Sequence, residues 1–432
     1  MLTKAVIKDV IVSNEDFILQ KVKNIVRRND VRFPESVNKT VILYGVRRSG
    51  KTFILFDLFR QHKGRSLYID FEDERLAGFQ VKDFELLRSS FLELKPDRMN
   101  GETVFLLDEV QNTKCWEVFC RRVVEREKAK VFVSGSSSRM MPFEIHTGLR
   151  GRVWSVEVLP FSFAEYLKIR NLDLREKNIL YGRSSITLRN YFSEYLRWGG
   201  FPEISLTESE FEKRKLLKEY FSAMFFRDMV ERYDMTNMPL LDALTDKLFT
   251  SFSTRLSLNS FYKQYKDKFP FSKDMLFRYY KDFLSSMLVF EVRKFAESTY
   301  KRMRNPAKIY MVDTGLCRRV GSEDSGRLLE NAIYLELRRR NCEAFYFEEK
   351  RECDFIAKAE DGKFMAIQVA FELNEQNRER EIGGLIMACE HLGIKEGTVL
   401  TYDSDEEEFK VGKITVNISP AWKWLISLDC RG

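Results

Sequence analysis

The sequence predicts an α/β fold whose N-terminal part is built on a parallel β-sheet. Short apolar runs alternate there with helix-like stretches, which is the pattern of strands that are buried on both faces and joined by helices. Polar or charged residues follow several of these runs, at the edge of the sheet where ligands bind in open α/β proteins. The strand candidates lie at residues 41–44, 66–73, 103–111, 130–140 and 147–160.

The size and composition of the chain are those of a multidomain globular protein. With 432 residues the chain is long enough for about three domains of ~150 residues, and 44% hydrophobic content is ordinary for globular cores. The net charge of +7 permits nucleic-acid binding without requiring it. The cysteines form no CxxC pair, the first residues lack a signal-peptide core, and no uncharged apolar run is long enough to span a bilayer. We therefore expect a cytoplasmic protein without a membrane partner.

The loop after the first strand candidate indicates nucleotide binding. Residues 45–52, GVRRSGKT, fit the pattern G-x-x-x-x-G-K-[ST] of a P-loop, and they lie between the apolar run VILY and the helix-like run FILFDLFRQ. Such a loop surrounds phosphate oxygens with backbone N–H groups at a helix N-terminus. Lys51 would reach the β- and γ-phosphates, and the Thr52 hydroxyl would ligate Mg²⁺. The alternative is a chance strand-turn-helix with solvated basic residues. The candidate nucleotide-binding residues are Gly45, Arg48, Ser49, Gly50, Lys51, Thr52 and Asp108.

An acidic pair at the end of the run TVFLLDEVQ, residues 103–111, supports the P-loop interpretation. The four apolar residues predict a buried parallel strand whose carboxyl end carries Asp108 and Glu109. Asp108 would hold Mg²⁺ through water, and Glu109 would orient and polarise the attacking water. The intervening strand candidate at 66–73 implies that the strand before the P-loop and the strand before the acids are not neighbours in sequence.

Two further side-chain types are candidates for catalysis. The run KVFVSGSSSRM ends in serines, of which Ser136, with Ser134 in reserve, would bond the attacking water or the phosphate; a Gly/Ser turn explains the pattern equally well. Arg150 and Arg152 stand just before the last strand candidate. From such an edge an arginine can enter the nucleotide site of an adjacent subunit, and we favour Arg152 for this role over Arg150, for which a solvated turn is the alternative.

Three further motifs join the nucleotide motifs in resembling a known family. The segments LPFSFAEYL (159–167), RWGGFPE (197–203) and FFRDMVERY (225–233) are similar to those of a bacterial and archaeal family of AAA+-type ATPases with a C-terminal region of unknown function. The resemblance covers nearly the whole chain and implies a five-stranded parallel sheet, a helical lid, a winged helix and a nuclease-like fold. Gly199 and Gly200 are candidate hinges of the lid. The implied boundaries are 1–160 for the ATPase core, 161–237 for the lid, 238–318 for the winged-helix segment and 319–432 for the degenerate nuclease-like domain.

Residues 238–304 contain short helix-like runs followed by a strand candidate and a basic segment. Ser257 and Ser272 each precede an apolar-periodic run and are candidate helix caps. Three helices followed by a hairpin describe a winged helix, in which the basic residues between 273 and 304 would contact DNA. Many winged helices serve only as packing units, so that alternative stays open. The basic residues of the presumed recognition helix are Lys273, Arg278 and Lys281.

The last hundred residues suggest a damaged nuclease fold of the PD-(D/E)xK type. Glu330 on a helix and Asp354 on a strand match the first two acids of that plan, in which acids hold Mg²⁺ and a lysine activates water. The positions expected for Glu and Lys are occupied by Gln368 and Ala370. A neutral amide is a weaker metal ligand and Ala has no ammonium group, so we expect a fold that binds or braces without cutting.

Three functions fit these features, and an ATPase fits best. It would need ATP and Mg²⁺, act through contacts in a homo-oligomer, and rearrange a nucleic-acid or protein partner; no NKxD-like guanine signature accompanies the P-loop. A nucleotide-gated nuclease requires metal ligands at 330, 354 and 368, and Gln368 counts against it. A nucleotide-switched DNA-binding regulator has no need of a base such as Glu109.

Overall fold

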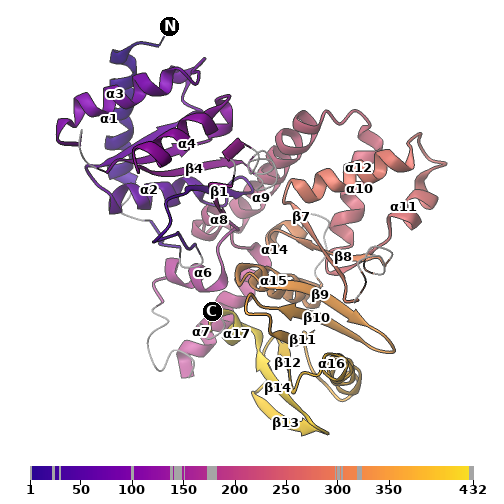
Figure 1. Ribbon diagram of the computed structural model, residues 1–432. Coiled ribbons are helices and arrows are strands. Elements are labelled where there is room, and N and C mark those ends of the chain that lie inside the picture. Colours follow the sequence, from indigo (N-terminus) through magenta and orange to yellow (C-terminus); the bar gives the residue numbers. More distant parts are fainter. Residues whose placement is uncertain are drawn as a thin grey trace. The chain divides into compact units, whose positions relative to one another are not determined.

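The computed structural model contains two compact units, Met1–Leu159 and Pro160–Gly432. The elements of the first unit are coloured indigo to purple in Figure 1, and those of the second run from magenta to yellow. No helix in the described part of the chain is long and apolar enough to cross a bilayer. The structure describes residues 2–21, 25–28, 31–98, 102–136, 140, 148–149, 151–172, 182–296, 298, 302, 305–318 and 324–427.

A five-stranded sheet forms the centre of the first unit. Its strands are β1 (Thr40–Gly45), β2 (Ser66–Asp70), β3 (Val104–Asp108), β4 (Lys130–Ser136) and β5 (Val153–Glu157). They follow the order β2-β3-β4-β1-β5, and every neighbouring pair is parallel. The expected five-stranded parallel sheet is therefore confirmed. Because β4 lies between β1 and β3, the P-loop and the acidic pair flank one strand at the carboxyl edge.

Helices cover both faces of this sheet because its strands are apolar on both sides. Ile42, Leu107 and Val133 belong to a core that also includes side chains of α1, α3 and α4, whereas Leu43 and Leu106 belong to a core on the other side with α2. The helices are α1 (Lys4–Lys21), α2 (Lys51–Gln61), α3 (Asp83–Leu94) and α4 (Trp116–Arg126), with 3₁₀ turns η2 (Glu74–Leu76), η3 (Pro96–Arg98) and η4 (Val110–Asn112).

The second unit begins with a group of helices. Ser162 and Glu165 form a capping box at the start of the first of them, so its orphan N–H groups are satisfied by its own side chains. A π-helical segment continues the last of them, at the FFRDMVERY motif. The elements are α6 (Phe163–Ile169), α7 (Gly182–Trp198), α8 (Pro202–Leu206), α9 (Glu210–Phe225) and η6 (Phe226–Glu231).

Three helices and three short strands follow in the middle of the second unit. Ser257 accepts a hydrogen bond from the Ser260 backbone N–H and Ser272 accepts one from that of Met275, so both predicted helix caps are confirmed. The strands pair antiparallel in the order β7-β8-β6. The elements are α10 (Met238–Thr250), β6 (Thr254–Leu256), α11 (Leu258–Tyr265), α12 (Lys273–Ser285), β7 (Val289–Lys294) and β8 (Ala307–Met311).

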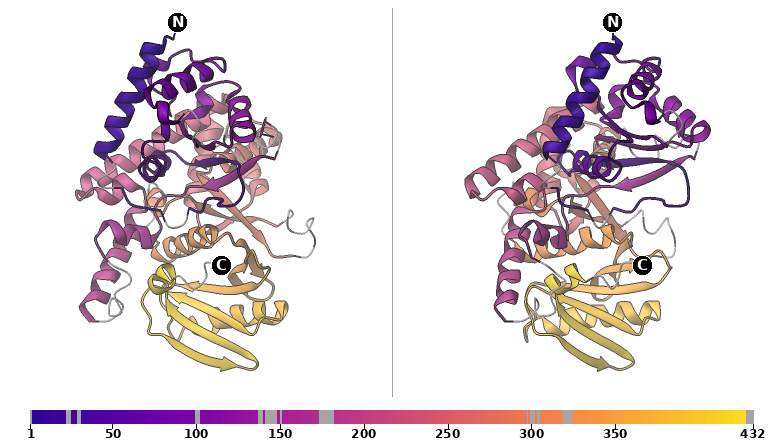
Figure 2. Two further views of the ribbon diagram at one scale, coloured as in Figure 1. Left: turned by 60° about the vertical axis from the view of Figure 1, so that its left-hand side comes forward. Right: turned by 90° about the vertical axis from the view of Figure 1, so that its left-hand side faces the viewer.

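The C-terminal part extends these strands into a nine-stranded sheet of order β13-β14-β12-β11-β10-β9-β7-β8-β6. A parallel pairing of β7 with β9 joins the two parts. Helix α16 packs along β10, β11 and β12, and it lies beside the yellow strands in Figure 2. The remaining elements are α14 (Thr314–Cys317), α15 (Ser325–Arg339), β9 (Glu343–Glu348), β10 (Glu352–Lys358), β11 (Phe364–Ala370), α16 (Arg378–Leu392), β12 (Glu396–Thr401), β13 (Glu407–Val411), β14 (Ile414–Pro420) and α17 (Ala421–Ile426).

The two glycines of the GGFP turn, which the sequence suggested as hinges, lie at closely packed positions. Asp313, which is buried at the start of α14, accepts hydrogen bonds from the Gly200 N–H at 2.7 Å and the Gly315 N–H at 2.9 Å. A Cβ at Gly199 would lie 1.9 Å from Asp313 Oδ1, and one at Gly200 would lie 2.2 Å from the carbonyl oxygen of Phe161. Gly200 therefore packs against the Phe161 backbone and Gly199 against the Asp313 side chain, and neither position has room for a Cβ.

We predict that Gly200→Ala lowers the free energy of unfolding by about 2 kcal/mol or more, because the added methyl group meets a backbone carbonyl that cannot move aside cheaply. Urea unfolding followed by tryptophan fluorescence measures the change. Gly326→Ala is the matched control, since its new Cβ would have no neighbour closer than 3.4 Å. Equal stability of Gly200→Ala and the wild type would contradict the packing role.

Candidate functional site

The P-loop conformation depends on two glycines. A Cβ at Gly45 would lie 2.2 Å from the carbonyl oxygen of Val158, so only glycine fits where β1 ends. Gly50 has φ 98°, in the left-handed region, and it caps α2 without a side-chain hydrogen bond. Arg48 also has a positive φ, of 66°. The loop therefore turns sharply into an α2 N-terminus whose first N–H groups have no side-chain cap, which is how a helix receives an anion.

Lys51 and Ser49 lie buried within this loop. The Lys51 ammonium donates to the carbonyl oxygens of Gly45 at 3.0 Å and Val46 at 2.9 Å, so the side chain folds over the loop. The Ser49 hydroxyl is buried and has no hydrogen-bond partner among the described residues. Arg28 donates to the carbonyl oxygens of Ser49 at 3.1 Å and Leu159 at 2.9 Å and so fastens the loop to the end of the sheet. No sequence motif marks Arg28.

Asp108 is the centre of the hydrogen bonds beneath the P-loop. It is 1% exposed and accepts hydrogen bonds from the Tyr68 hydroxyl at 2.9 Å and from the hydroxyls of Ser134 and Thr52. Burial raises the pKa of the Asp108 carboxyl, and the charge of Glu109 raises it further, while these hydrogen bonds oppose the shift. The predicted metal-binding pair, Thr52 and Asp108, is thus brought together.

Glu109 is held in an unusual backbone conformation beside this carboxylate. Its φ is 48°, in the left-handed region that a non-glycine residue enters at a cost, and its side chain accepts a hydrogen bond from the Gln111 amide. Asp70, opposite Asp108 in the register of β2 and β3, is a third acid at this edge. Burial raises the pKa of Asp70 to about 6, and the charge of Asp108 also raises it. The sequence analysis passed over Asp70, although its place at the end of a strand was a signal.

The two candidate serines, Ser134 and Ser136, both belong to β4. Ser136 pairs in register with Gly45 and therefore ends its strand beside the start of the P-loop, but its side chain lies outside the described residues. Ser134, which was the reserve candidate, donates to Asp108 and lies 3.4 Å from the Glu109 backbone N–H. The Ser134 hydroxyl thus lies against the acidic pair.

Arg152 lies at the opposite edge of the sheet from the P-loop of its own chain. Its carbonyl oxygen accepts a hydrogen bond from the Thr40 N–H at the amino ends of β5 and β1, and its guanidinium group pairs with Glu125 of α4. About half of the Arg152 side chain is exposed. A role for Arg152 in catalysis would therefore have to be exerted on a neighbouring chain. Arg150 lies outside the described residues.

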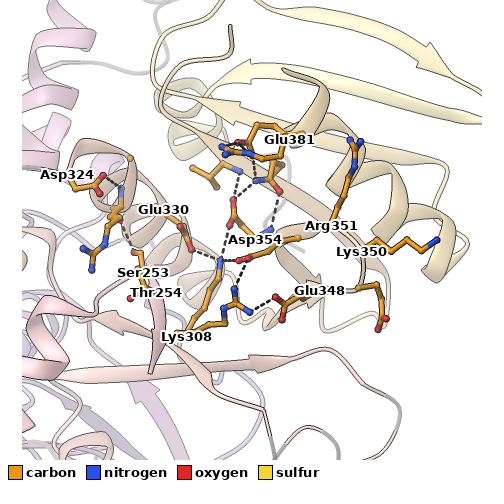
Figure 3. Close-up of a pocket in the computed structure, with 18 residues that line it drawn as sticks. Ser253, Thr254, Lys308, Asp324, Glu330, Glu348, Lys350, Arg351, Asp354 and Glu381 are labelled. Atoms are coloured by element: carbon orange, nitrogen blue, oxygen red, sulfur yellow. Dashed lines mark hydrogen bonds and ion pairs between the residues drawn. The ribbon is translucent and has the colours of Figure 1, made fainter. Parts of the chain in front are cut away.

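A second cluster of ionisable groups lies in the C-terminal part, and Figure 3 shows it lining a pocket of about 690 Å³. Glu330 and Asp354 are brought together there, as the sequence predicted. Lys308, on β8, lies between them, with its ammonium nitrogen 3.2 Å from Glu330 Oε1 and 2.9 Å from Asp354 Oδ1. Gln368 donates to Asp354 at 2.8 Å and to Glu381 of α16 at 2.6 Å.

The sequence analysis missed Lys308 and Glu381 because no spacing relates them to the nuclease pattern. Burial opposes a charge on Lys308, but the carboxylates of Asp354 and Glu330 raise its pKa well above the ordinary value. Burial raises the pKa of Glu330 to about 7, and Lys308 opposes that shift. The Lys308 ammonium group is therefore charged, and it lies among the acids.

The basic residues of the presumed recognition helix are exposed to solvent. Lys273, Arg278 and Lys281 all lie on α12, and the solvent reaches each of them. Two further basic residues of the segment expected to contact DNA, Arg293 and Lys294, lie on β7. They form ion pairs with Glu291 and Glu349, respectively. The remaining basic residues up to position 304 lie largely outside the described part of the chain.

Comparison with known proteins relates the chain to two described domains. An AAA domain matches residues 37–167, and a domain of unknown function, DUF8612, matches residues 189–326. The Walker-type ATPase PABY2304 of Pyrococcus abyssi is similar in structure with a TM-score of 0.44 and 16% identity, over 72% of this chain and 95% of that one.

Relatives of similar length occur in archaea and bacteria. An uncharacterized protein of Haemophilus influenzae is 24% identical over 79% of this chain and 84% of its own. The uncharacterized protein MJ1544 of Methanocaldococcus jannaschii is 34% identical over 98% of this chain and 96% of its own. The chain therefore belongs to the same protein family as MJ1544, and its residues 37–167 form an AAA domain, the nucleotide-binding part of P-loop ATPases.

Proposed function

We propose that this protein is a Mg²⁺-dependent ATPase that uses hydrolysis to rearrange a nucleic-acid or protein partner. The observation that carries the proposal is the contact of Thr52, at the end of the P-loop, with the buried Asp108, which ends β3 and is followed by Glu109. An oxygen-only pair of this kind suits Mg²⁺, which is bound in proteins by few side-chain oxygens and retains several waters.

The residues of the loop fit a nucleotide. The Ser49 hydroxyl is buried without a partner among the described residues, and the N-terminus of α2 has no side-chain cap, so donors remain for phosphate oxygens. Lys51 supplies a positive charge from within the loop, at present bonded to two carbonyl oxygens. Thr52 and Asp108 would hold Mg²⁺, which when bound neutralises charge on the phosphates.

The acids at the edge of the sheet suit the activation of water. Glu109 would accept the proton of the attacking water, and the Gln111 amide restricts the rotation of the Glu109 carboxylate. Ser134 bonds Asp108 and approaches the Glu109 backbone, so it positions both acids without touching the reacting atoms. We retain Ser136 as a candidate for direct contact with the γ-phosphate, because its strand ends in register with Gly45.

Residues 238–311 support a winged-helix assignment for the partner-binding part. The order helix, strand, helix, helix and hairpin, seen in α10, β6, α11, α12 and β7–β8, is that of a winged helix. In such a module α12 would be the recognition helix, with its exposed basic residues facing phosphates. We further propose that 161–237 act as the lid and that 319–432 are a nuclease-like fold.

The two other functions fit less well. A nuclease would need a third acid where Gln368 stands, and the Gln368 amide is already bonded to both Asp354 and Glu381. A regulator that only switches with nucleotide does not need a base at Glu109. The strained backbone of this residue would then lower the stability of the fold without serving the function. An ATPase needs no metal ligand at position 368, and it does need a base at position 109.

We predict that Lys51→Ala weakens ATP binding on the order of 100-fold, because it removes the charge that faces the phosphates. Glu109→Gln should keep ATP affinity near that of the wild type but lower turnover by about 100-fold or more, since the amide keeps the shape and cannot take the proton. Binding of a fluorescent ATP analogue and release of phosphate measure the two effects. Glu102→Gln, at the amino edge of the sheet, is the matched control. Comparable hydrolysis by Glu109→Gln and the wild type would overturn the assignment of the base.

A second prediction concerns Arg152, which we propose to act on the nucleotide site of an adjacent subunit. Lys51→Ala and Arg152→Ala proteins should each be inactive, and mixing them should restore part of the activity, because a mixed interface can pair an intact P-loop with an intact arginine. Arg65→Ala, which removes another half-exposed arginine at the amino edge, should retain activity. A specific rate that does not change with concentration in a strict monomer rules out the proposal.

A third prediction is that the protein binds DNA weakly and without strong sequence preference through α12, with a dissociation constant of about 10⁻⁴–10⁻⁶ M that rises steeply with salt. An Arg278→Ala/Lys281→Ala variant should bind more weakly and with a smaller salt dependence, as fluorescence anisotropy would measure. Lys247→Ala, on α10, is the control. Unchanged affinity in the double variant would refute the assignment of the recognition helix.

A further inference from the structure

The pocket in the C-terminal part is lined by acids and bases in nearly equal numbers, so its overall charge favours neither sign. At its inner end, however, the acids gather around one lysine. The Lys308 ammonium nitrogen lies 2.7 Å from Glu352 Oε1, 2.9 Å from Asp354 Oδ1 and 3.2 Å from Glu330 Oε1 (Figure 3). An ammonium group has three N–H donors, and three carboxylates are within its reach.

Two of these acids also accept hydrogen bonds from other donors of the chain. Asp354 Oδ2 accepts from the Gln368 amide at 2.8 Å and from the Val369 N–H at 3.0 Å. Glu330 Oε1 accepts from the Tyr310 hydroxyl at 2.6 Å. The Lys308 side chain is only 4% exposed, which places its charge among the acids rather than in solvent. Removing one partner of such a buried group of charges is strongly destabilising, because it leaves the other charges buried and uncompensated.

We propose that Lys308 is the resident cation of this pocket: its ammonium group takes the position that a divalent cation would take among Glu330, Glu352 and Asp354, and it excludes such an ion. One lysine on β8 thereby replaces a metal ion in holding the acids of α15 and β10 together. This inference does not depend on ATP hydrolysis, since it concerns the second unit alone.

The distances distinguish an ammonium group from a metal ion. Oxygen ligands lie at about 2.0–2.1 Å from Mg²⁺ and about 2.3–2.6 Å from Ca²⁺, so the acids stand further from the Lys308 nitrogen than they would from either ion. In the described part of the chain, no group of three or more His, Cys, Asp or Glu side chains has the proximity of a metal-binding set. The acids are spaced for hydrogen bonds to an ammonium group.

Removal of the ammonium group should turn the pocket into a divalent-cation site. The three carboxylates would then repel one another in a partly buried place, and a divalent ion is the small solute that best relieves this repulsion. We expect Lys308→Ala to unfold at a lower temperature than the wild type and to bind Mn²⁺ about tenfold or more tightly. Because the ion binds only the folded protein, Mn²⁺ should raise the unfolding temperature of this variant by several degrees.

The experiment compares the full-length wild type, Lys308→Ala and Lys308→Ala/Asp354→Asn without nucleotide. Thermal unfolding with and without Mn²⁺ is one measurement. Luminescence of Tb³⁺ is the other, because Tyr310 bonds Glu330 directly and would sensitise an ion bound there. Lys363→Ala is the matched control, since it removes a lysine of the same part of the chain that is 83% exposed and forms an ion pair with Asp361. A gain of Mn²⁺ and Tb³⁺ binding in Lys308→Ala alone, lost again in the double variant, supports the proposal.

Two results would overturn it. Metal binding by Lys308→Ala that is no tighter than that of the wild type would show that the ammonium group does not exclude an ion. Binding of Tb³⁺ or Mn²⁺ by the wild type that is lost in Asp354→Asn would also show that the ammonium group does not exclude an ion. This comparison of the wild type with Asp354→Asn tests the proposal even if Lys308→Ala does not fold. Folding of Lys308→Ala only when Mn²⁺ is added would count as support.

Discussion

The hydrogen bonds to the buried Asp108 carboxylate are the constraint on which the nucleotide site depends. They come from Tyr68 of β2, Ser134 of β4 and Thr52 of α2, so one carboxylate fixes three strands and the helix behind the P-loop relative to one another. Burying a carboxylate without such donors would destabilise the fold. The parallel sheet supplies the frame, and the hydrogen bonds of Asp108 set the position of Thr52 and Glu109 within it.

The two units treat a buried carboxylate in opposite ways. Asp108 is bonded by hydroxyl groups, which are neutral, so its negative charge remains available to a cation outside the protein. Asp354 is bonded by the Lys308 ammonium group, which cancels the charge from within. The chemistry of the donor therefore separates a site that can take part in nucleotide binding from one that is complete without a ligand.

Much of the first unit could be predicted from the sequence because its signals are local. The P-loop pattern, the apolar strands and the acids at their ends lie within short segments, whereas the order of the strands across the sheet is known only from the structure. The contact of Ser134 with Asp108 could not be read from the sequence, since it depends on the pairing of β3 with β4. Lys308 and Glu381 could not be found at all. They join Glu330 and Asp354 only through the pairing of distant strands and the packing of α16, which no spacing along the chain encodes.

The parallel pairing of β7 with β9 has a consequence for how the second unit could be divided. Each of these strands is covered on both edges, β7 by β8 and β9, and β9 by β7 and β10. Expression of the chain in two fragments, separated between α14 and α15, would leave an uncovered strand edge on each fragment. Such edges recruit other chains and promote aggregation. The strands β6–β8 and the strands that follow them therefore depend on one another for their edges, so the shared sheet is best kept within one polypeptide.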